Sequence, residues 1–267
     1  MPRMSNAPLR YVLAMMRFPK ILNIEKLIPE FQDQIRDEYP HLSENVTQGV
    51  QVSVGPNGTE TKPTSDKLWQ FASPDRGCAF ILGGEFLVLH AGPAYQGHED
   101  FIARFQQVVE ASLRVKGLAR HVTNLGYRYV DLVKPDAAKQ QTLSTYLQPW
   151  VMPDEKTIQL PDLELKDSAA FMVFKTLQGM LRFQIFRRPP ATLSPDLISP
   201  FVKENNWLLP RPDGEFALLD LDHGKKFADT PAIDAKQIAE HLRALRQPIN
   251  DLFFKAAVTP AALTEWK

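Results

Sequence analysis

The chain has 267 residues, of which 44% are hydrophobic, and its 31 Lys and Arg are balanced by 31 Asp and Glu. Proteins that hold nucleic acid by its phosphates usually carry a basic surplus, so the zero net charge argues against that class. No apolar run approaches the ~18 residues of a membrane helix. The single cysteine cannot form an internal disulfide, and residues 1–7 lack the apolar segment of a secretion signal, so we expect a cytoplasmic protein.

The chain opens with a segment, residues 9–18, that is apolar on both alternating faces. This pattern is typical of a strand that is covered on both sides of a sheet. Apolar residues then recur at helical spacing from Ile24 to Tyr39. Pro29 lies inside that pattern, so the helix either kinks there or begins near it, and Pro40 ends it.

Between Val46 and Ala91 the apolar period changes to two, which predicts strands. Alternating valines at 50–54 lead into residues 55–66, whose polar, Pro- and Gly-containing composition predicts a long exposed loop. Glycine-containing turns then separate the three strands of an antiparallel meander, which we expect at 68–73, 78–82 and 86–90.

The clearest helix begins at His98, with two acidic residues in its first turn, and Gly117 is a natural end for it. A second strand that is apolar on both faces is predicted over residues 122–133. The order strand, helix, meander, helix, strand is typical of an α+β protein rather than of alternating parallel units.

The second part of the chain resembles the first in style. Residues 169–176 and 180–187 predict a hairpin around Gln178-Gly179, and residues 216–222 predict one more strand. Six of the 22 prolines fall between Pro189 and Pro212, which predicts a long crossing loop with one short helix near residues 195–205. Thr230 and Pro231 are expected to begin a last amphipathic helix that kinks or breaks at Pro248.

These elements predict an α+β fold with antiparallel sheets and long amphipathic helices. Each half offers a set of strands followed by one long helix, so we expect two similar α+β halves, residues 1–134 and 135–267, which can pack as one continuous domain.

Several short segments, taken in order, form a recognisable pattern along nearly the whole chain. They are Pro8-Leu9 with Arg17-Phe18, Trp69 with Phe71, Tyr95-Gln96-Gly97 with Phe101, Gly126 to Asp131, Asp220 to Asp222, and a tail from Leu245 through Phe253 and Thr259 to Trp266. This pattern resembles a family of uncharacterised bacterial proteins of similar length that is sporadically distributed among genomes. In this chain His98 stands where such proteins often have Trp, and Asp131 where they often have Asn. The resemblance implies a bacterial cytoplasmic protein, an accessory or defence-associated factor, and no assigned activity.

The sequence Asp220-Leu221-Asp222-His223 is the sharpest local feature with a chemical interpretation. Two carboxylates on one face of a strand and a histidine at its end could hold a divalent cation for hydrolysis or phosphoryl transfer. The same residues also describe a strand that leaves the core through a polar turn. We favour this turn because the sequence offers no second carboxylate cluster at a diagnostic spacing. His90, His98 and Glu99 are a second set of candidate metal ligands. For this set too we favour a purely structural role over a metal site.

Arginines on predicted strands suggest a binding site. Burying a guanidinium alone would cost several kcal/mol, so Arg128 must meet a carboxylate or several carbonyls. Either it pairs internally with an acid such as Asp220 or Asp131, or Arg17, Arg128 and Arg187 bind an anion or a partner's acidic residue, with Tyr95 as a fourth candidate.

Other signatures of catalysis are missing from the sequence. Cys78 alternates with apolar residues, which predicts a buried and inert thiol. No nucleophile elbow, phosphate-binding loop, dinucleotide fingerprint or zinc-protease motif occurs, and we expect no cofactor. Trp150, Trp207 and Trp266 lie outside the predicted strands, where they can anchor packing between halves or a partner.

The leading hypothesis is therefore a protein that binds another protein and is not a catalyst. Membrane contact is excluded from this hypothesis, nucleic acid is disfavoured, and homo-oligomers remain open. The alternatives are a metal-dependent hydrolase or nuclease built on Asp220 and Asp222 with a histidine, and an anion or nucleotide sensor built on Arg17 and Arg128.

Overall fold

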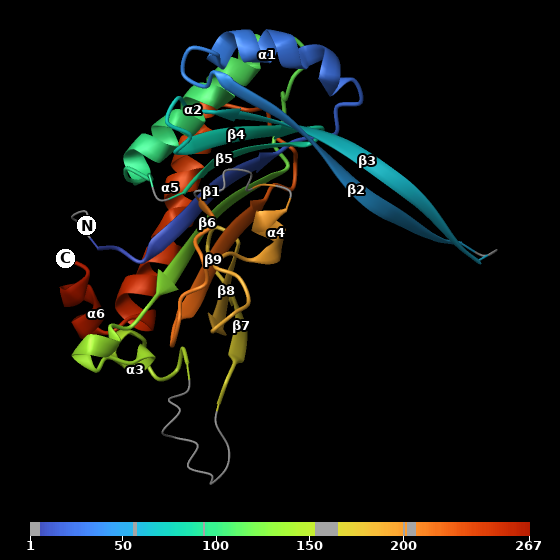
Figure 1. Ribbon diagram of the computed structural model, residues 1–267. Coiled ribbons are helices and arrows are strands. Elements are labelled where there is room, and N and C mark those ends of the chain that lie inside the picture. The colour runs from blue at the N-terminus through green and yellow to red at the C-terminus, as the bar shows by residue number, and fades with distance from the viewer. Residues whose placement is uncertain (1–5, 56–57, 93, 153–164, 200, 202–206) are drawn as a thin grey trace.

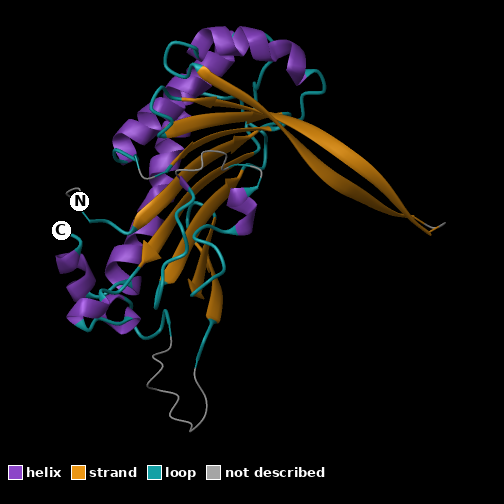
Figure 2. Ribbon diagram, in the orientation of Figure 1, coloured by secondary structure: helices purple, strands orange, loops and turns teal. Residues whose placement is uncertain are grey.

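The computed structural model describes residues 6–55, 58–92, 94–152, 165–199, 201 and 207–267. One antiparallel sheet of nine strands, in the order β2-β3-β4-β5-β1-β6-β9-β8-β7, forms its centre (Figures 1 and 2). The strands are β1 (Leu9–Arg17), β2 (His41–Gly55), β3 (Gly58–Ala72), β4 (Cys78–Gly83), β5 (Phe86–Ala91), β6 (Asn124–Val133), β7 (Ser168–Lys175), β8 (Met180–Arg187) and β9 (Ala217–Lys226).

Three substantial helices cover one face of this sheet, which we call the helical face (Figure 2). They are α1 (Ile28–Ile35), α2 (His98–Arg114) and α5 (Ala235–Asp251). Short helical turns complete the chain: η1 (Ile24–Leu27), η2 (Ala137–Lys139), α3 (Leu143–Tyr146), α4 (Pro195–Ile198), the π-helical turn η5 (Leu252–Ala257) and α6 (Pro260–Glu265). No helix in the described ranges is both long and apolar enough to cross a membrane.

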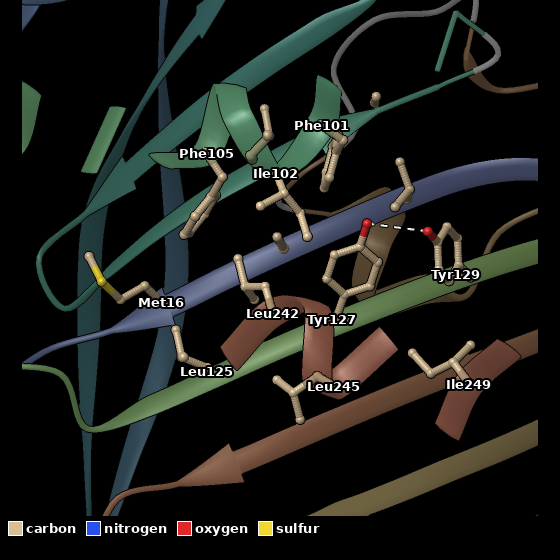
Figure 3. Close-up of a cluster of buried hydrophobic side chains, with 14 of the residues drawn as sticks. Met16, Phe101, Ile102, Phe105, Leu125, Tyr127, Tyr129, Leu242, Leu245 and Ile249 are labelled. Carbon is tan, nitrogen blue, oxygen red and sulfur yellow. Dashed lines mark hydrogen bonds between the residues drawn. The ribbon is translucent and has the colours of Figure 1, made fainter. Parts of the chain in front are cut away.

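The predicted two-sided strand β1 lies in the middle of the sheet, between β5 and β6. Its alternate residues face two separate apolar clusters, one on each side of the sheet. On the helical face, Phe101 and Phe105 of α2 and Leu242 and Leu245 of α5 pack onto the sheet beside Tyr127 (Figure 3). This confirms the predicted burial of both faces.

The opposite face, which we call the loop face, is covered by the described part of residues 188–216, the crossing segment. Leu193, beside α4, and Leu197, within it, belong to the apolar cluster of this face, and Trp207 farther along packs against Tyr11 of β1. A long crossing connection with one short helix was predicted for this proline-rich stretch, and α4 confirms it. Residues 200 and 202–206 of that prediction lie outside the described residues.

The expected loop at residues 55–66 is wrong for the residues described. From Gly58 onwards the chain continues as β3, which pairs with β2 from Gly55↔Gly58 to His41↔Ala72. Pro63 misled the prediction, because proline is usually absent from strands. Among the described residues, β3 pairs with β4 only over Trp69–Ala72, so the rest of β3 is an edge strand, which is where sheets tolerate proline.

Two predicted boundaries also shift. The expected turn at Asp222-His223-Gly224 is wrong, because β9 continues to Lys226 and pairs with both β6 and β8. The last helix begins at Ala235 instead of Thr230, since the Asp234 side chain accepts hydrogen bonds from the backbone N–H groups of residues 236 and 237. It passes through Pro248 and changes to a π-helical turn at Leu252.

The predicted α+β class with an antiparallel sheet is confirmed, whereas two similar halves are not supported. β6 pairs with β9 along ten residue pairs, so strands from before and after residue 134 belong to one sheet. Six strands come from residues 1–134 and three from the rest. That unequal division gives no sign of a repeated unit.

Gly179 provides a test of the β7–β8 turn. Its φ is +156°, and a Cβ there would lie 2.0 Å from the Gly224 carbonyl oxygen of β9. We expect Gly179→Ala to lower the free energy of unfolding, measured by urea titration, by more than ~2 kcal/mol. The reason is that the backbone of the turn or of β9 must shift to make room for the Cβ atom. Gly126→Ala, whose Cβ would meet only Met15 at 3.9 Å, is the control. Equal losses for the two variants would contradict the close approach.

Candidate functional site

Arg128 of β6 is held by two carboxylates on the loop face. Its Nε and Nη2 donate to Asp220 at 2.7 and 2.6 Å, and its Nη1 donates to Asp196 of α4 at 2.6 Å. Ser194 Oγ adds a hydrogen bond of 2.5 Å to Asp220. Of the alternatives that the sequence left open for Arg128, the structure contains the internal pairing, with Asp220.

This arrangement leaves little of Arg128 for a ligand. Asp220 is only 1% exposed, and both of its oxygens accept hydrogen bonds from the guanidinium. Asp196 occupies the other side of the guanidinium fork. Because Asp196 belongs to the crossing segment and Asp220 to the sheet, the arginine fastens the one to the other.

The other predicted arginines lie elsewhere. Arg17 forms a half-exposed ion pair of 2.8 Å with Glu85. Arg187 is buried on the helical face, where it meets Glu215 at 3.2 Å and Met152 Sδ at 3.4 Å. The sheet separates Arg187 from Arg128, so the structure does not bring the three arginines together around one anion.

The structure does not assemble the Asp220, Asp222 and His223 metal set. Alternate residues of β9 point to opposite faces, so both aspartates face the loop side and His223 the helical side. His223 Nδ1 donates to the Leu245 carbonyl at 2.6 Å, and its Nε2 lies 2.8 Å from Thr176 Oγ1. Among the residues with described positions, no group of three metal-binding side chains is found.

The second predicted ligand set, His90 with His98 and Glu99, is divided in the same way. His90 is fully buried on the loop face, with Nδ1 2.9 Å from the Tyr11 hydroxyl, and burial lowers its pKa to about 3. His98 begins α2 on the other face, 2.8 Å from Glu99. Its pKa falls to about 4, first because of burial and then because of the charge of Arg246.

Tyr95 belongs to a network of phenol groups on the helical face. Its hydroxyl lies 3.0 Å from that of Tyr129, which lies 3.2 Å from the Tyr127 hydroxyl and accepts a hydrogen bond of 3.1 Å from Arg246 Nε. Figure 3 shows the contact between Tyr127 and Tyr129. Burial raises the pKa of Tyr95 and of Tyr127, so both phenols keep their protons.

Tyr95 also lines a pocket of about 650 Å³ between α2 and the turn after β3. Its volume suits a small molecule. Three of its charged groups already have partners: Arg104 donates to Asp100 at 2.8 Å, and Asp75 accepts from Ser73 Oγ and from the N–H of Gly77. Cys78 lines the same wall, and burial raises its pKa to about 12, consistent with the predicted unreactive thiol.

Two surfaces were not predicted as sites from the sequence. The first is the arm, defined as the part of the β2–β3 hairpin beyond its pairing with β4, residues 45–55 and 58–68 (Figure 1). At about 3.3 Å per residue the arm is roughly 35 Å long. Val46 and Val52 on one face of β2 are 59% and 57% exposed.

The second surface is the outer strand at the other end of the sheet, β7. Its residues alternate between half-buried and exposed. The exposed ones include Phe171 and Val173, which are 58% and 46% exposed and share the loop face with Met180 of β8. The available signal was the lack of any charge between Asp167 and Lys175, which is unusual for an edge strand.

The predicted tryptophans are used mainly inside the molecule. Trp207 packs against His90 and donates from Nε1 to the Arg76 carbonyl at 3.0 Å. Trp266 is buried against Tyr146 and Phe253. Trp150 is half exposed and donates to the Ala256 carbonyl at 2.8 Å.

The chain matches no protein-family model, no curated protein and no solved structure. Its function must therefore be argued from its own residues.

The ion pairs of Arg128 with Asp220 and Asp196 lead to a first testable prediction for the site. Arg128→Met leaves Asp220 buried without its partner, so we expect a loss of ~3–5 kcal/mol in the free energy of unfolding. Adding Asp220→Asn should recover part of that loss. Arg17→Met, which breaks an exposed pair, should cost less than ~1 kcal/mol. Denaturant titration that finds Arg128→Met as mild as the control would refute the structural role.

A second prediction concerns Asp131, which is buried on the helical face of β6, opposite Leu219 of β9. Burial, assisted by the charge of Asp220, raises its pKa from the ordinary 3.8 to about 7, and Arg10 opposes this rise. Between these two pH values the folded chain holds one more proton than the unfolded chain, so stability falls as the pH rises from about 4 to about 7.

Asp131→Asn removes this titration. We expect the variant to be more stable than the native chain at pH 8, by up to ~4 kcal/mol, with the difference shrinking toward pH 4. Thermal melts across that range measure it, and Asp229→Asn, at an exposed position, is the matched control. A difference that does not vary with pH would show that Asp131 ionises normally.

Proposed function

We propose that this is a protein that binds another protein, and that the arm is the element that reaches the partner. The observation that carries the proposal is a free two-stranded ribbon with exposed valines, standing away from the helix-covered sheet (Figure 1). A protein-binding role is compatible with a cytoplasmic accessory factor, which is what the resemblance found in the sequence implies.

Stability arguments support a partner for the arm. A two-stranded ribbon is at best marginally stable in water, because it has no second layer against which to bury side chains. Among its described residues, the contacts with the rest of the chain lie at its base, where Leu68 is buried in the loop-face cluster, Lys67 pairs with Glu25 at 3.1 Å and Asp66 pairs with Lys20 at 3.8 Å. The apolar face of Val46 and Val52 would gain its burial from another molecule.

Charge favours a protein as that molecule. Within the arm, Glu60 and Asp66 balance Lys62 and Lys67. Arms that follow nucleic acid need a surplus of Lys and Arg to replace counterions along the phosphates. A neutral ribbon with β-branched apolar side chains suits an apolar groove on a protein instead.

Site-specific photo-cross-linking tests the proposal in cells that naturally contain the protein. A photoreactive residue at position 52 should capture one defined protein, whereas the same residue at Lys236, exposed on α5, should not. Equal capture from both positions would count against the arm as the binding element.

The captured partner then allows a binding measurement. Val46→Thr with Val52→Thr keeps the β-branched shape but adds hydroxyl groups to the apolar face, and should weaken binding roughly tenfold or more. Ser43→Thr, on the other face of β2, should leave the dissociation constant unchanged. Unaltered binding by the double variant would refute the role of the valines.

A further inference from the structure

The outer edge of β7 offers backbone groups to a further strand. Within the residues that the structure describes, no strand pairs with this edge. Thr176 donates its N–H to the Gly179 carbonyl across the turn, so even-numbered residues of β7 face β8. The N–H and C=O groups of Ala169, Phe171 and Val173 therefore point outward.

Among the described residues, the stretch from Ser168 to Phe174 lacks the prolines, charges and bulges that commonly block strand addition at an edge. Residues 168–174 include no proline and no charge, and the pairing with β8 runs without a bulge from Ser168↔Arg187 to Lys175↔Met180. Exposed Phe171 and Val173 extend an apolar surface to the rim. An edge of this kind suits a partner that adds a strand.

The sequence of β7 and its flanks is complementary to itself. We propose that two copies of this chain pair through antiparallel β7 strands on a two-fold axis at Phe171. In that register Asp167 faces Lys175 of the second copy, and the reciprocal pair forms by symmetry. Both residues are exposed in the single chain. Opposite charges placed directly across two strands attract each other.

The remaining pairs in this register place a small side chain opposite a large one. Ala169 meets Val173 on the loop face, and Ala170 meets Met172 on the helical face, while the two Phe171 rings meet at the axis. Moving the axis to Met172 puts Asp167 opposite the exposed Leu177, and moving it to Ala170 puts Asp167 opposite Val173. Both shifts lose the ion pairs, so charge selects the register centred on Phe171.

This charge complementarity indicates that the strand added to the edge is the β7 of a second copy. An unrelated strand could use the same hydrogen bonds, but only a second β7 supplies Asp167 and Lys175 at the matching distance from a shared centre. The two copies would then form one continuous sheet, with both helical faces on the same side. This inference is independent of the arm, and a chain lacking the arm is expected to dimerise as well.

Sedimentation of the purified full chain over a concentration series tests the dimer. We expect a reversible species of twice the chain mass, and a chain that stays monomeric throughout would overturn the proposal. Val173→Pro removes an outward N–H while leaving the bonds to β8 intact, so it should fold normally and weaken dimerisation at least a hundredfold. Dimers that persist in this variant would show that another surface is used.

Charge exchange identifies the register. Lys175→Glu and Asp167→Lys each place like charges opposite each other, so each alone should weaken dimerisation tenfold or more. An equimolar mixture of the two variants restores both attractive pairs in the mixed dimer, and should recover affinity to within about threefold of the native chain. A mixture that behaves like the separate variants would overturn the Phe171 register, and a strand-adding partner other than a second copy would leave all of these chains monomeric.

Discussion

The central strand β1 is apolar on both faces, and this constraint determines where the other elements lie. A strand of this kind needs neighbours on both edges and cover on both faces. β5 and β6 supply the edges, α2 and α5 cover the helical face, and the crossing segment covers the loop face. That cover is limited in extent, whereas the sheet is nine strands wide. At both of its ends apolar strand residues reach solvent: Val46 and Val52 in the arm, and Phe171 and Val173 on β7.

The loop face also contains the polar groups that fix the crossing segment in place. A segment rich in proline cannot attach itself by regular backbone pairing, because it lacks many of the N–H donors that a ladder needs. Arg128 solves this problem by donating to Asp220 in the sheet and to Asp196 in α4. The same arginine that resembled an anion site in the sequence is therefore a structural link. Its replacement is expected to loosen the cover over Tyr11 and His90 rather than to remove a ligand.

How far the sequence could be interpreted depended on whether a residue's neighbours were local. The two-sided pattern of β1 predicted its burial, whereas the cost of an unpaired guanidinium indicated only that Arg128 needs a partner and left Asp220, Asp131 and a bound anion as alternatives. The β2–β3 arm was missed because Gly and Pro signals for a loop outweighed a weak alternation of polar residues. Asp222-His223-Gly224 resembled a turn because polar residues in a buried strand need partners, and none was visible in the sequence. In the structure Asp222 meets Arg182, and His223 meets Thr176 and the Leu245 carbonyl, all on elements distant in sequence. Such partners become visible only in the folded chain.

The two ends of the sheet differ in a way that makes their proposed roles compatible. The arm is a ribbon that is already hydrogen-bonded within itself, so it offers side chains, whereas the rim at β7 offers unpaired backbone as well. Pairing through β7 would place the two arms at opposite ends of one long sheet, because β2 is the strand farthest from β7 in the strand order. Each arm would then be free of the dimer contact. A dimer of this shape would hold two partner molecules apart and bind a target with two such sites more tightly than either arm alone.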